Sequence, residues 1–227
     1  MSDARALRVL DLHKSFETGD ETVNVLDGVS FDLQQGEAVA ITGPSGSGKS
    51  TLLHLLGALD TPTSGTIEID GANPFGLAEK DLARFRNKTL GFVFQEHHLL
   101  PQYTVLENVL LPTLAFPPAP NAAEGTAREL LDRVGLSHRL SHRPTELSGG
   151  EKQRAAVARA LVQGPKVVLC DEPTGNLDRA NADAVARLLF ELHGEADNVL
   201  IVVTHSQDLA RRFARRFDLL EGKLSDI

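Results

Sequence analysis

The sequence predicts an α/β fold with a mostly parallel sheet, an antiparallel β part and an inserted helical part. Three continuous apolar runs, at 38–42, 167–170 and 199–203, carry this prediction. Half-exposed strands alternate between apolar and polar residues, whereas the central strands of a covered parallel sheet are apolar on both faces. Polar residues follow each run, so they lie at the carboxyl ends of strands, where open α/β sheets bind ligands.

A glycine-rich loop follows the first apolar run and precedes a helical pattern at 52–59. Its spacing is G-x-x-x-x-G-K-[ST], in which inward-pointing backbone N–H groups and a helix start cradle phosphates. The residues expected to bind the phosphates are Gly43, Pro44, Ser45, Gly46, Ser47, Gly48, Lys49, Ser50 and Thr51. Lys49 is expected to reach the β- and γ-phosphates, and the Ser50 hydroxyl to bind Mg²⁺. The loop therefore predicts a P-loop NTPase core, because a turn that binds nothing would not need the flanking strand and helix.

Other segments follow different hydrophobic periods. Residues 29–33 and 67–69 alternate, which predicts antiparallel strands. Helical patterns at 104–115 and 121–134 are separated by the proline-rich stretch 117–120, which cannot continue a helix.

Two more helices are expected at 150–163 and at 180–192, the second ending before Gly194. We therefore expect one domain, 1–227, which is long enough to bury its own core. Residues 1–95 and 164–227 form the nucleotide-binding core with the antiparallel β subdomain, and about 96–163 form the helical subdomain.

The net charge of −8 argues against broad nucleic-acid binding and against direct adhesion to an anionic membrane. The arginine-rich stretch 211–217 fits a solvated helix face, because Leu209, Phe213 and Phe217 recur at helical spacing. No apolar run approaches the roughly 18 residues that span a bilayer, and the first residues lack an apolar signal core. We expect a cytosolic protein with a buried Cys170, its only cysteine, and with any membrane contact made through another protein.

A second glycine-containing segment opens the helix predicted at 150–163. Ser148, Gly149 and Gly150 place a hydroxyl and two glycines at a helix start, which is a second anion-binding terminus. Taken alone, the segment fits an ordinary serine N-cap equally well.

Together these motifs closely resemble those of the ATP-binding cassette ATPases, the motor subunits of ABC transporters, over nearly the whole chain. Residues 43–51 resemble the Walker A loop, 147–154 the signature motif and 167–171 the Walker B strand. The remaining matches are Gln95 to the Q-loop glutamine, Glu172 to the catalytic glutamate, 176–178 to the D-loop and His205 to the switch histidine.

The resemblance implies that ATP is the nucleotide and that Ser50, Gln95 and Asp171 hold Mg²⁺. It implies that Glu172 accepts a proton from the attacking water. It also implies that His205 senses or stabilises the γ-phosphate, which Lys49 contacts as well. Family members often stack adenine on a tyrosine, and Phe16 stands in the corresponding place. A core role for Phe16 is the alternative.

The resemblance also implies a composite site, in which the signature of one chain faces the phosphate loop of a second. We therefore expect a second ATPase subunit, as a homodimer in the complex, and integral membrane permease subunits. The segment 95–101, with Leu99 and Leu100 before Pro101, is a candidate docking site for a permease, with local packing as the alternative. No nucleic acid is expected as a partner.

The local sequence at 97–101, 107–109, 142–144 and 174–178 is similar to the branch that contains lipoprotein-releasing transporters, with macrolide exporters and cell-division ATPases close by. This implies a motor at the cytoplasmic face of the inner membrane.

Three other interpretations fit the sequence less well. A soluble ABC ATPase of translation or DNA repair commonly has tandem cassettes or long coiled coils, and this chain has one cassette and no sustained heptads. A GTPase or kinase would leave the segment 148–150 unexplained. A zinc site at His97 and His98 or at His138 and His142 lacks further converging ligands.

Overall fold

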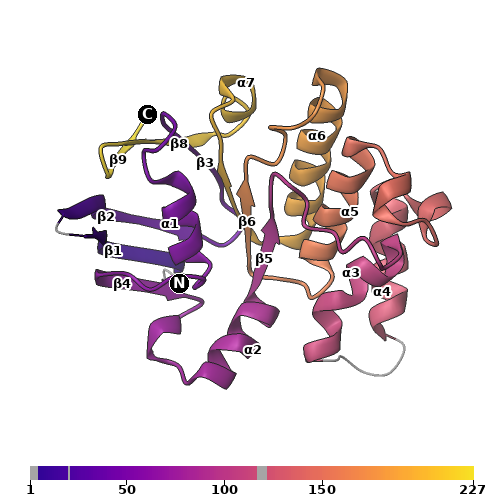
Figure 1. Cartoon of the computed structure of the whole chain (residues 1–227), viewed down its shortest axis with the longest axis horizontal. Coiled ribbons are helices and arrows are strands. Elements are labelled where there is room, and N and C mark those ends of the chain that lie inside the picture. Colours follow the sequence, from indigo (N-terminus) through magenta and orange to yellow (C-terminus); the bar gives the residue numbers. More distant parts are fainter. Residues whose placement is uncertain (1–4, 20, 117–121) are drawn as a thin grey trace.

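A six-stranded sheet forms the centre of the protein in the computed structural model, which describes residues 5–19, 21–116 and 122–227 (Figure 1). Its strand order is β5 (Leu90–Val93), β6 (Val167–Asp171), β7 (Val199–Val203), β3 (Ala38–Thr42), β8 (Arg215–Leu220) and β9 (Lys223–Asp226). All neighbours are parallel except β8 and β9. The three apolar runs are therefore adjacent central strands, as predicted.

A second sheet of three antiparallel strands lies beside the first (Figure 1). Its order is β2 (Glu21–Gln34), β1 (Arg5–Thr18) and β4 (Ser64–Ile69). Val29, Phe31 and Leu33 of β2 are buried, with exposed or half-buried residues between them. The alternation at 29–33 and 67–69 thus correctly predicted strands that cover one side of a core.

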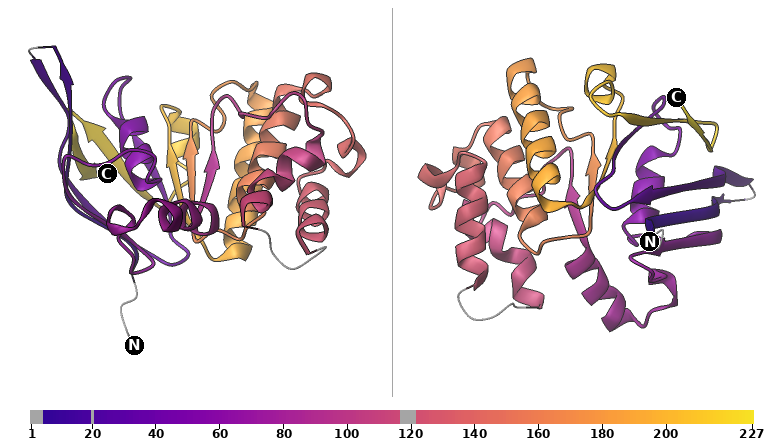
Figure 2. Two further views of the ribbon diagram at one scale, coloured as in Figure 1. Left: turned by 60° about the horizontal axis from the view of Figure 1, so that its bottom comes forward. Right: turned by 180° about the vertical axis from the view of Figure 1, so that it is seen from behind.

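The central sheet separates two apolar cores. On β7, Val199, Ile201 and Val203 point into the core shared with the antiparallel sheet and helix α1 (Lys49–Leu56). Leu200 and Val202 point the other way, toward helices α3 (Val105–Ala115), α5 (Gly149–Leu161) and α6 (Arg179–Ala196). Figure 2 shows helices on both sides of the sheet. A strand buried on both faces needs apolar residues at every position, which explains the continuous runs.

The remaining helices are short or peripheral. They are α2 (Glu79–Thr89), α4 (Ala122–Arg133), α7 (Gln207–Ala210) and the 3₁₀ turns η1 (Pro74–Gly76), η2 (Ser137–Arg139) and η3 (Pro144–Glu146). The helices predicted at 104–115, 121–134 and 150–163 are present as α3, α4 and α5. The linker at 117–120, Asn121 and residues 1–4 lie outside the described residues. In the part that is described, no helix is long and apolar enough to span a bilayer.

Three predicted helix boundaries were wrong. Helix α6 continues through Gly194 to Ala196 and ends where Asp197 adopts a left-handed φ of 49° and donates its N–H to the His193 carbonyl. A glycine inside a helix costs only about 1 kcal/mol, so packing of the preceding turns carries the helix past it. Helix α1 begins at Lys49 and ends at Leu56, not at residue 59, because Ala58 takes a φ of 51°.

The helix expected around 209–217 was also wrong. Leu209 ends up in α7, Phe217 in β8, and Phe213 in the turn between them, and all three are buried. A spacing of four residues fits successive helical turns but also places positions with even separation on one side of a strand. Arg211 and Arg212 are exposed, as expected of a solvated surface.

Gly91 sets the distance between β5 and helix α5. A Cβ at this position would stand 2.4 Å from the Ala160 carbonyl oxygen and 3.0 Å from Pro165. A separation of 2.4 Å is a steric clash, and the Ala160 carbonyl oxygen cannot rotate away because it belongs to the backbone. The helix that starts at the signature segment is therefore fixed against the strand that leads to Gln95.

We expect Gly91→Ala to destabilise the protein by about 1–3 kcal/mol, because the methyl group forces β5 and α5 apart. Chemical unfolding would measure the loss. Gly125→Ala is the control, since this glycine lies exposed in α4 with no atom within 4 Å of the added Cβ, and it should stabilise by up to about 1 kcal/mol. Equal stability of Gly91→Ala and wild type would show that the strand and helix are not held at this distance.

Candidate nucleotide-binding site

The phosphate loop joins β3 to helix α1, with Gly48 at the N-cap in a left-handed conformation (φ 100°). No side chain caps this helix, whereas Thr104, Ser148 and Asp178 cap α3, α5 and α6. The first N–H groups of a helix have no intrahelical acceptor and carry partial positive charge. Helix α1 is therefore the one among these four whose N-terminal donors are left for an anion.

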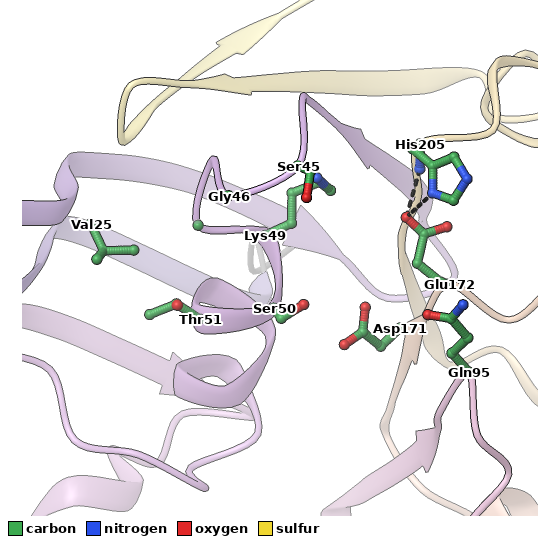
Figure 3. A pocket seen from close by; sticks show the side chains of 11 residues that line it. Val25, Ser45, Gly46, Lys49, Ser50, Thr51, Gln95, Asp171, Glu172 and His205 are labelled. Atoms are coloured by element: carbon green, nitrogen blue, oxygen red, sulfur yellow. Dashed lines mark hydrogen bonds and ion pairs between the residues drawn. The ribbon is translucent and has the colours of Figure 1, made fainter. Parts of the chain in front are cut away.

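A cleft of about 500 Å³ opens at this helix start (Figure 3). It is lined by Val25, Ser45, Gly46, Gly48, Lys49, Ser50, Thr51, Gln95, Asp171, Glu172 and His205. The Lys49 ammonium lies over the loop, where it donates to the carbonyls of Gly43 (2.9 Å) and Pro44 (2.8 Å).

The polar side chains in this cleft come from segments at the carboxyl ends of four parallel strands. The phosphate loop follows β3, Gln95 follows β5, Asp171 ends β6, and His205 follows β7. Residues far apart in the sequence therefore meet at one edge of the sheet, where open α/β sheets bind ligands.

Glu172 is held in a left-handed backbone conformation, with φ 44°. Its carboxylate is nearly buried (12% exposed), whereas the His205 ring is 68% exposed. One carboxylate oxygen, Oε1, accepts from the backbone N–H of His205 and lies 2.7 Å from His205 Nδ1 (Figure 3). Non-glycine residues adopt such a φ at a cost of about 1–3 kcal/mol, and they do so mainly at functional sites.

Asp171 stands beside Ser50 in the cleft (Figure 3). Burial raises the pKa of Asp171 above its ordinary value and the Glu172 charge adds to this, while the Ser50 hydroxyl and Lys49 act in the opposite direction. A hydroxyl, a carboxylate and the Gln95 amide are all oxygen donors, the kind that Mg²⁺ prefers. The residues present thus fit a magnesium ion. In the described residues, no three His, Cys, Asp or Glu side chains are grouped as for a transition metal.

Gln95 is also joined to the segment after β6. Its Nε2 donates to Asn176 Oδ1 (3.0 Å), and Asn176 Nδ2 lies 3.4 Å from the Gln95 carbonyl oxygen. The residue expected at the metal is therefore tied to the segment that resembles the D-loop.

The second glycine segment does not line the cleft. Ser148, Gly149 and Gly150 open helix α5, and a Cβ on Gly150 would stand 2.3 Å from Asn181 Oδ1 of α6. The structure therefore does not bring the two glycine sites of one chain together.

Glu151 occupies this second helix start. The backbone N–H and the hydroxyl of Ser148 donate to its carboxylate (2.8 Å each), and Arg139 pairs with it at 2.9 Å. These hydrogen bonds and the Arg139 charge lower the pKa of Glu151 to about 2. The arginine thus balances a negative charge at a helix terminus that would otherwise oppose anion binding.

Two residues behave differently from expectation. Phe16 is 42% exposed, so its alternative core role is wrong, but it does not line the cleft; Lys14 Nζ lies 4.7 Å from its ring centroid. Val25 does line the cleft and was not predicted, because nothing in the sequence shows that β2 passes over the phosphate loop.

Comparison with known proteins decides the family. A model of the ABC transporter family matches residues 26–175. The chain belongs to the ABC transporter family. This ABC ATPase is 52% identical to the lipoprotein-releasing system ATP-binding protein LolD 1 of Rhodopirellula baltica, over 96% of this chain and 95% of the relative. It is also 52% identical to the protein LolD of Pseudomonas fluorescens, over 99% of each chain.

Among solved structures, the ABC ATPase resembles the dimeric cassette MJ0796 in a post-hydrolysis state bound to ADP and Pi. The TM-score is 0.89 at 36% identity, over 97% of each chain. The predicted α/β fold is thus confirmed, and so are ATP as the substrate and ATP hydrolysis as the reaction. ABC ATPase subunits dimerise and pair with membrane components, which agrees with the partner classes expected from the sequence.

We expect Glu151→Gln to lower the free energy of unfolding by about 1 kcal/mol at pH 7, because the charged cap is lost while the shape is kept. The folded-state pKa of about 2 lies below the ordinary 4.5, so the ionised group stabilises fully above pH 4.5. The gap between wild type and variant should shrink as the pH falls from 4.5 toward 2, measured by urea unfolding. Glu129→Gln on exposed α4 is the control, and a pH-independent gap for Glu151→Gln would contradict the argument.

Proposed function

We propose that this ABC ATPase drives lipoprotein release from the cytoplasmic membrane. The observation that carries the proposal is the 52% identity, over nearly the full length of both chains, to subunits of the lipoprotein-releasing system. The ATPases of macrolide exporters and of cell-division complexes are the alternatives, because their local sequences are similar. A soluble ABC ATPase of translation or DNA repair is the more distant one.

We propose further that two copies form the working site. In one chain the open N-terminus of α1 and the Ser148–Glu151 terminus of α5 are separate, and each offers donors for only part of a triphosphate. A head-to-tail pair with twofold symmetry places Ser148, Gly149 and Gly150 of one copy opposite the phosphate loop of the other, so each ATP meets both.

Within this site the chain's own residues have separate roles in hydrolysis. We assign Lys49 and the N–H groups of residues 43–51 to holding the β- and γ-phosphates. We assign Glu172 to accepting the proton from the attacking water, and His205, whose ring contacts the Glu172 carboxylate, to the γ-phosphate. Ser50, Gln95 and Asp171 would hold Mg²⁺, which would neutralise charge on the phosphate oxygens. Phe16 is assigned to the adenine, on the ring face away from Lys14.

We propose the segment 97–104 as the docking site for an integral permease subunit, which would hold the motor at the cytoplasmic face of the inner membrane. The segment starts with left-handed residues His97 (φ 61°) and His98 (φ 48°), whose carbonyls accept from Arg159 at 2.6 and 2.5 Å. It exposes Leu100 and Tyr103, each 39%.

The other end of this segment is fastened by Asn108, which is fully buried in α3. Its amide accepts from the Leu100 N–H at 2.7 Å and donates to the carbonyls of Leu100, Tyr103 and Thr104. The segment is therefore shaped before a partner arrives, which reduces the entropy lost on binding. We assign it to the helical subdomain, about 96–163, and the other residues to the nucleotide-binding core.

We expect Glu172→Gln to keep ATP binding and to lower turnover by about 100-fold or more, because an amide cannot accept the proton of water. Binding would be measured with radiolabelled ATP and turnover by phosphate release. The variant should also accumulate as an ATP-bound dimer in size-exclusion chromatography. Turnover near that of wild type would refute the assignment of the base.

We expect the double variant Leu100→Ser, Tyr103→Ser to lose most of the permease that co-purifies from native membranes, while the hydrolysis rate of the isolated chain is unchanged. Leu114→Ser is the control, because Leu114 is more exposed (71%) but lies near the far end of α3, about 15 Å along the helix axis from the N-cap Thr104. Mass spectrometry of the co-purified subunit identifies the transporter. Recovery of ribosomes or DNA ends with the wild type would favour the soluble alternative.

A further inference from the structure

Thr204 is a polar residue with no exposed surface, at the end of the apolar strand β7. It does not line the nucleotide cleft. Its backbone N–H continues the sheet by donating to the Ile41 carbonyl (3.0 Å). Valine would suit the end of such a strand equally well, so the hydroxyl is the feature that needs an explanation.

The hydroxyl makes two hydrogen bonds. Thr204 Oγ1 donates to Glu172 Oε2 at 2.8 Å and accepts from the Ser206 backbone N–H at 3.0 Å. Because Oγ1 accepts the Ser206 N–H with a lone pair, the hydroxyl hydrogen is left to point toward the Glu172 carboxylate. Because the buried hydroxyl makes both hydrogen bonds, the cost of removing it from water is compensated.

The two oxygens of the Glu172 carboxylate are therefore held by different residues. His205 holds Oε1 through its backbone N–H and its ring, and Thr204 holds Oε2. If only His205 held the carboxylate, the carboxylate could still rotate about the Cγ–Cδ bond of Glu172. With both, the plane of the carboxylate is fixed, and so is the direction in which it faces the cleft.

We propose that Thr204 is a positioning residue for hydrolysis, which aims the Glu172 carboxylate at the attacking water. The proposal rests on the assignment of Glu172 as the base. Thr204 touches neither nucleotide nor water in this scheme, so it acts on the catalytic step and not on ATP binding. A shift of a catalytic group by about 1 Å can lower a rate about 100-fold, so loss of the Thr204 hydroxyl can have a large effect on hydrolysis.

The test compares Thr204→Val, which replaces the hydroxyl by a methyl group of similar size, with Thr204→Ser, which keeps it. Steady-state hydrolysis is measured on the full chain assembled with its permease. We expect Thr204→Val to lower kcat about 10- to 100-fold and to change KM for ATP by less than about twofold. Thr204→Ser should restore kcat to within about threefold of wild type. Thr204→Ala removes the same hydroxyl without added bulk and carries the test if the valine variant does not fold.

Ser206→Ala is the matched control for a merely structural role. The Ser206 hydroxyl caps α7 by accepting from the Leu209 N–H (3.3 Å), in the same turn, and makes no hydrogen bond to Glu172. It should lower thermal stability and leave kcat unchanged. An equal loss of kcat in Ser206→Ala and Thr204→Val, or a serine variant as slow as the valine variant, would overturn the proposal.

Two further measurements separate this proposal from the assignment of the base. Thr204→Val should accumulate as the ATP-bound dimer, because it slows hydrolysis after ATP has bound. Combined with Glu172→Gln, it should slow the residual turnover by less than about twofold, because residues that act as a unit are not additive. If Glu172→Gln blocks turnover and Thr204→Val does not, only the role of Thr204 is wrong. If Glu172→Gln turns over normally, the base assignment fails first.

Discussion

The register between β6 and β7 is the constraint on which the nucleotide site depends. Asp171 pairs with Val203, and the Glu172 N–H donates to the Val203 carbonyl (3.0 Å), so the polar residues that follow the two strands stand side by side. A slip by one residue would turn every side chain of a strand to the opposite face and separate the carboxylate from His205. Apolar packing on both faces of β7 opposes such a slip, because each of its residues belongs to one core or the other. The packing of β7 in the two cores therefore also fixes the position of Glu172 beside His205.

The chain has two helix termini of different kinds. Helix α1 leaves its N–H groups without a side-chain cap and is backed by a lysine, whereas α5 satisfies its own terminus with Ser148 and Glu151. A bound anion would stabilise the N-terminus of α1. The N-terminus of α5 already carries the Glu151 carboxylate, which pairs with Arg139. The two halves of the proposed composite site therefore differ in charge, and Arg139 offsets the negative charge of Glu151, which would otherwise repel phosphate.

The sequence predicted the parts of this structure that depend on local chemistry. A strand buried on both faces, a phosphate loop and a capped helix each leave a pattern in consecutive residues, and β3, β6, β7, α3 and α5 were found where expected. The errors came where tertiary packing overrides local preference, as when α6 passes Gly194. Val25 and Thr204 could not be predicted, since their roles arise only when β2 crosses the loop and when β7 ends beside Glu172. The contact between Gln95 and Asn176 likewise joins two loops whose sequences carry no sign of each other.

Cys170 offers a practical consequence. It is the only thiol of the chain and is fully buried in β6, where desolvation raises its pKa and keeps it protonated. Thiolates react with maleimides and thiols do not do so readily, so the natural cysteine is shielded from such reagents. New cysteines can therefore be placed on the surface without first removing the old one. A fluorophore pair on the rim of the cleft and at the start of α5 would test in real time whether two copies approach and separate during hydrolysis.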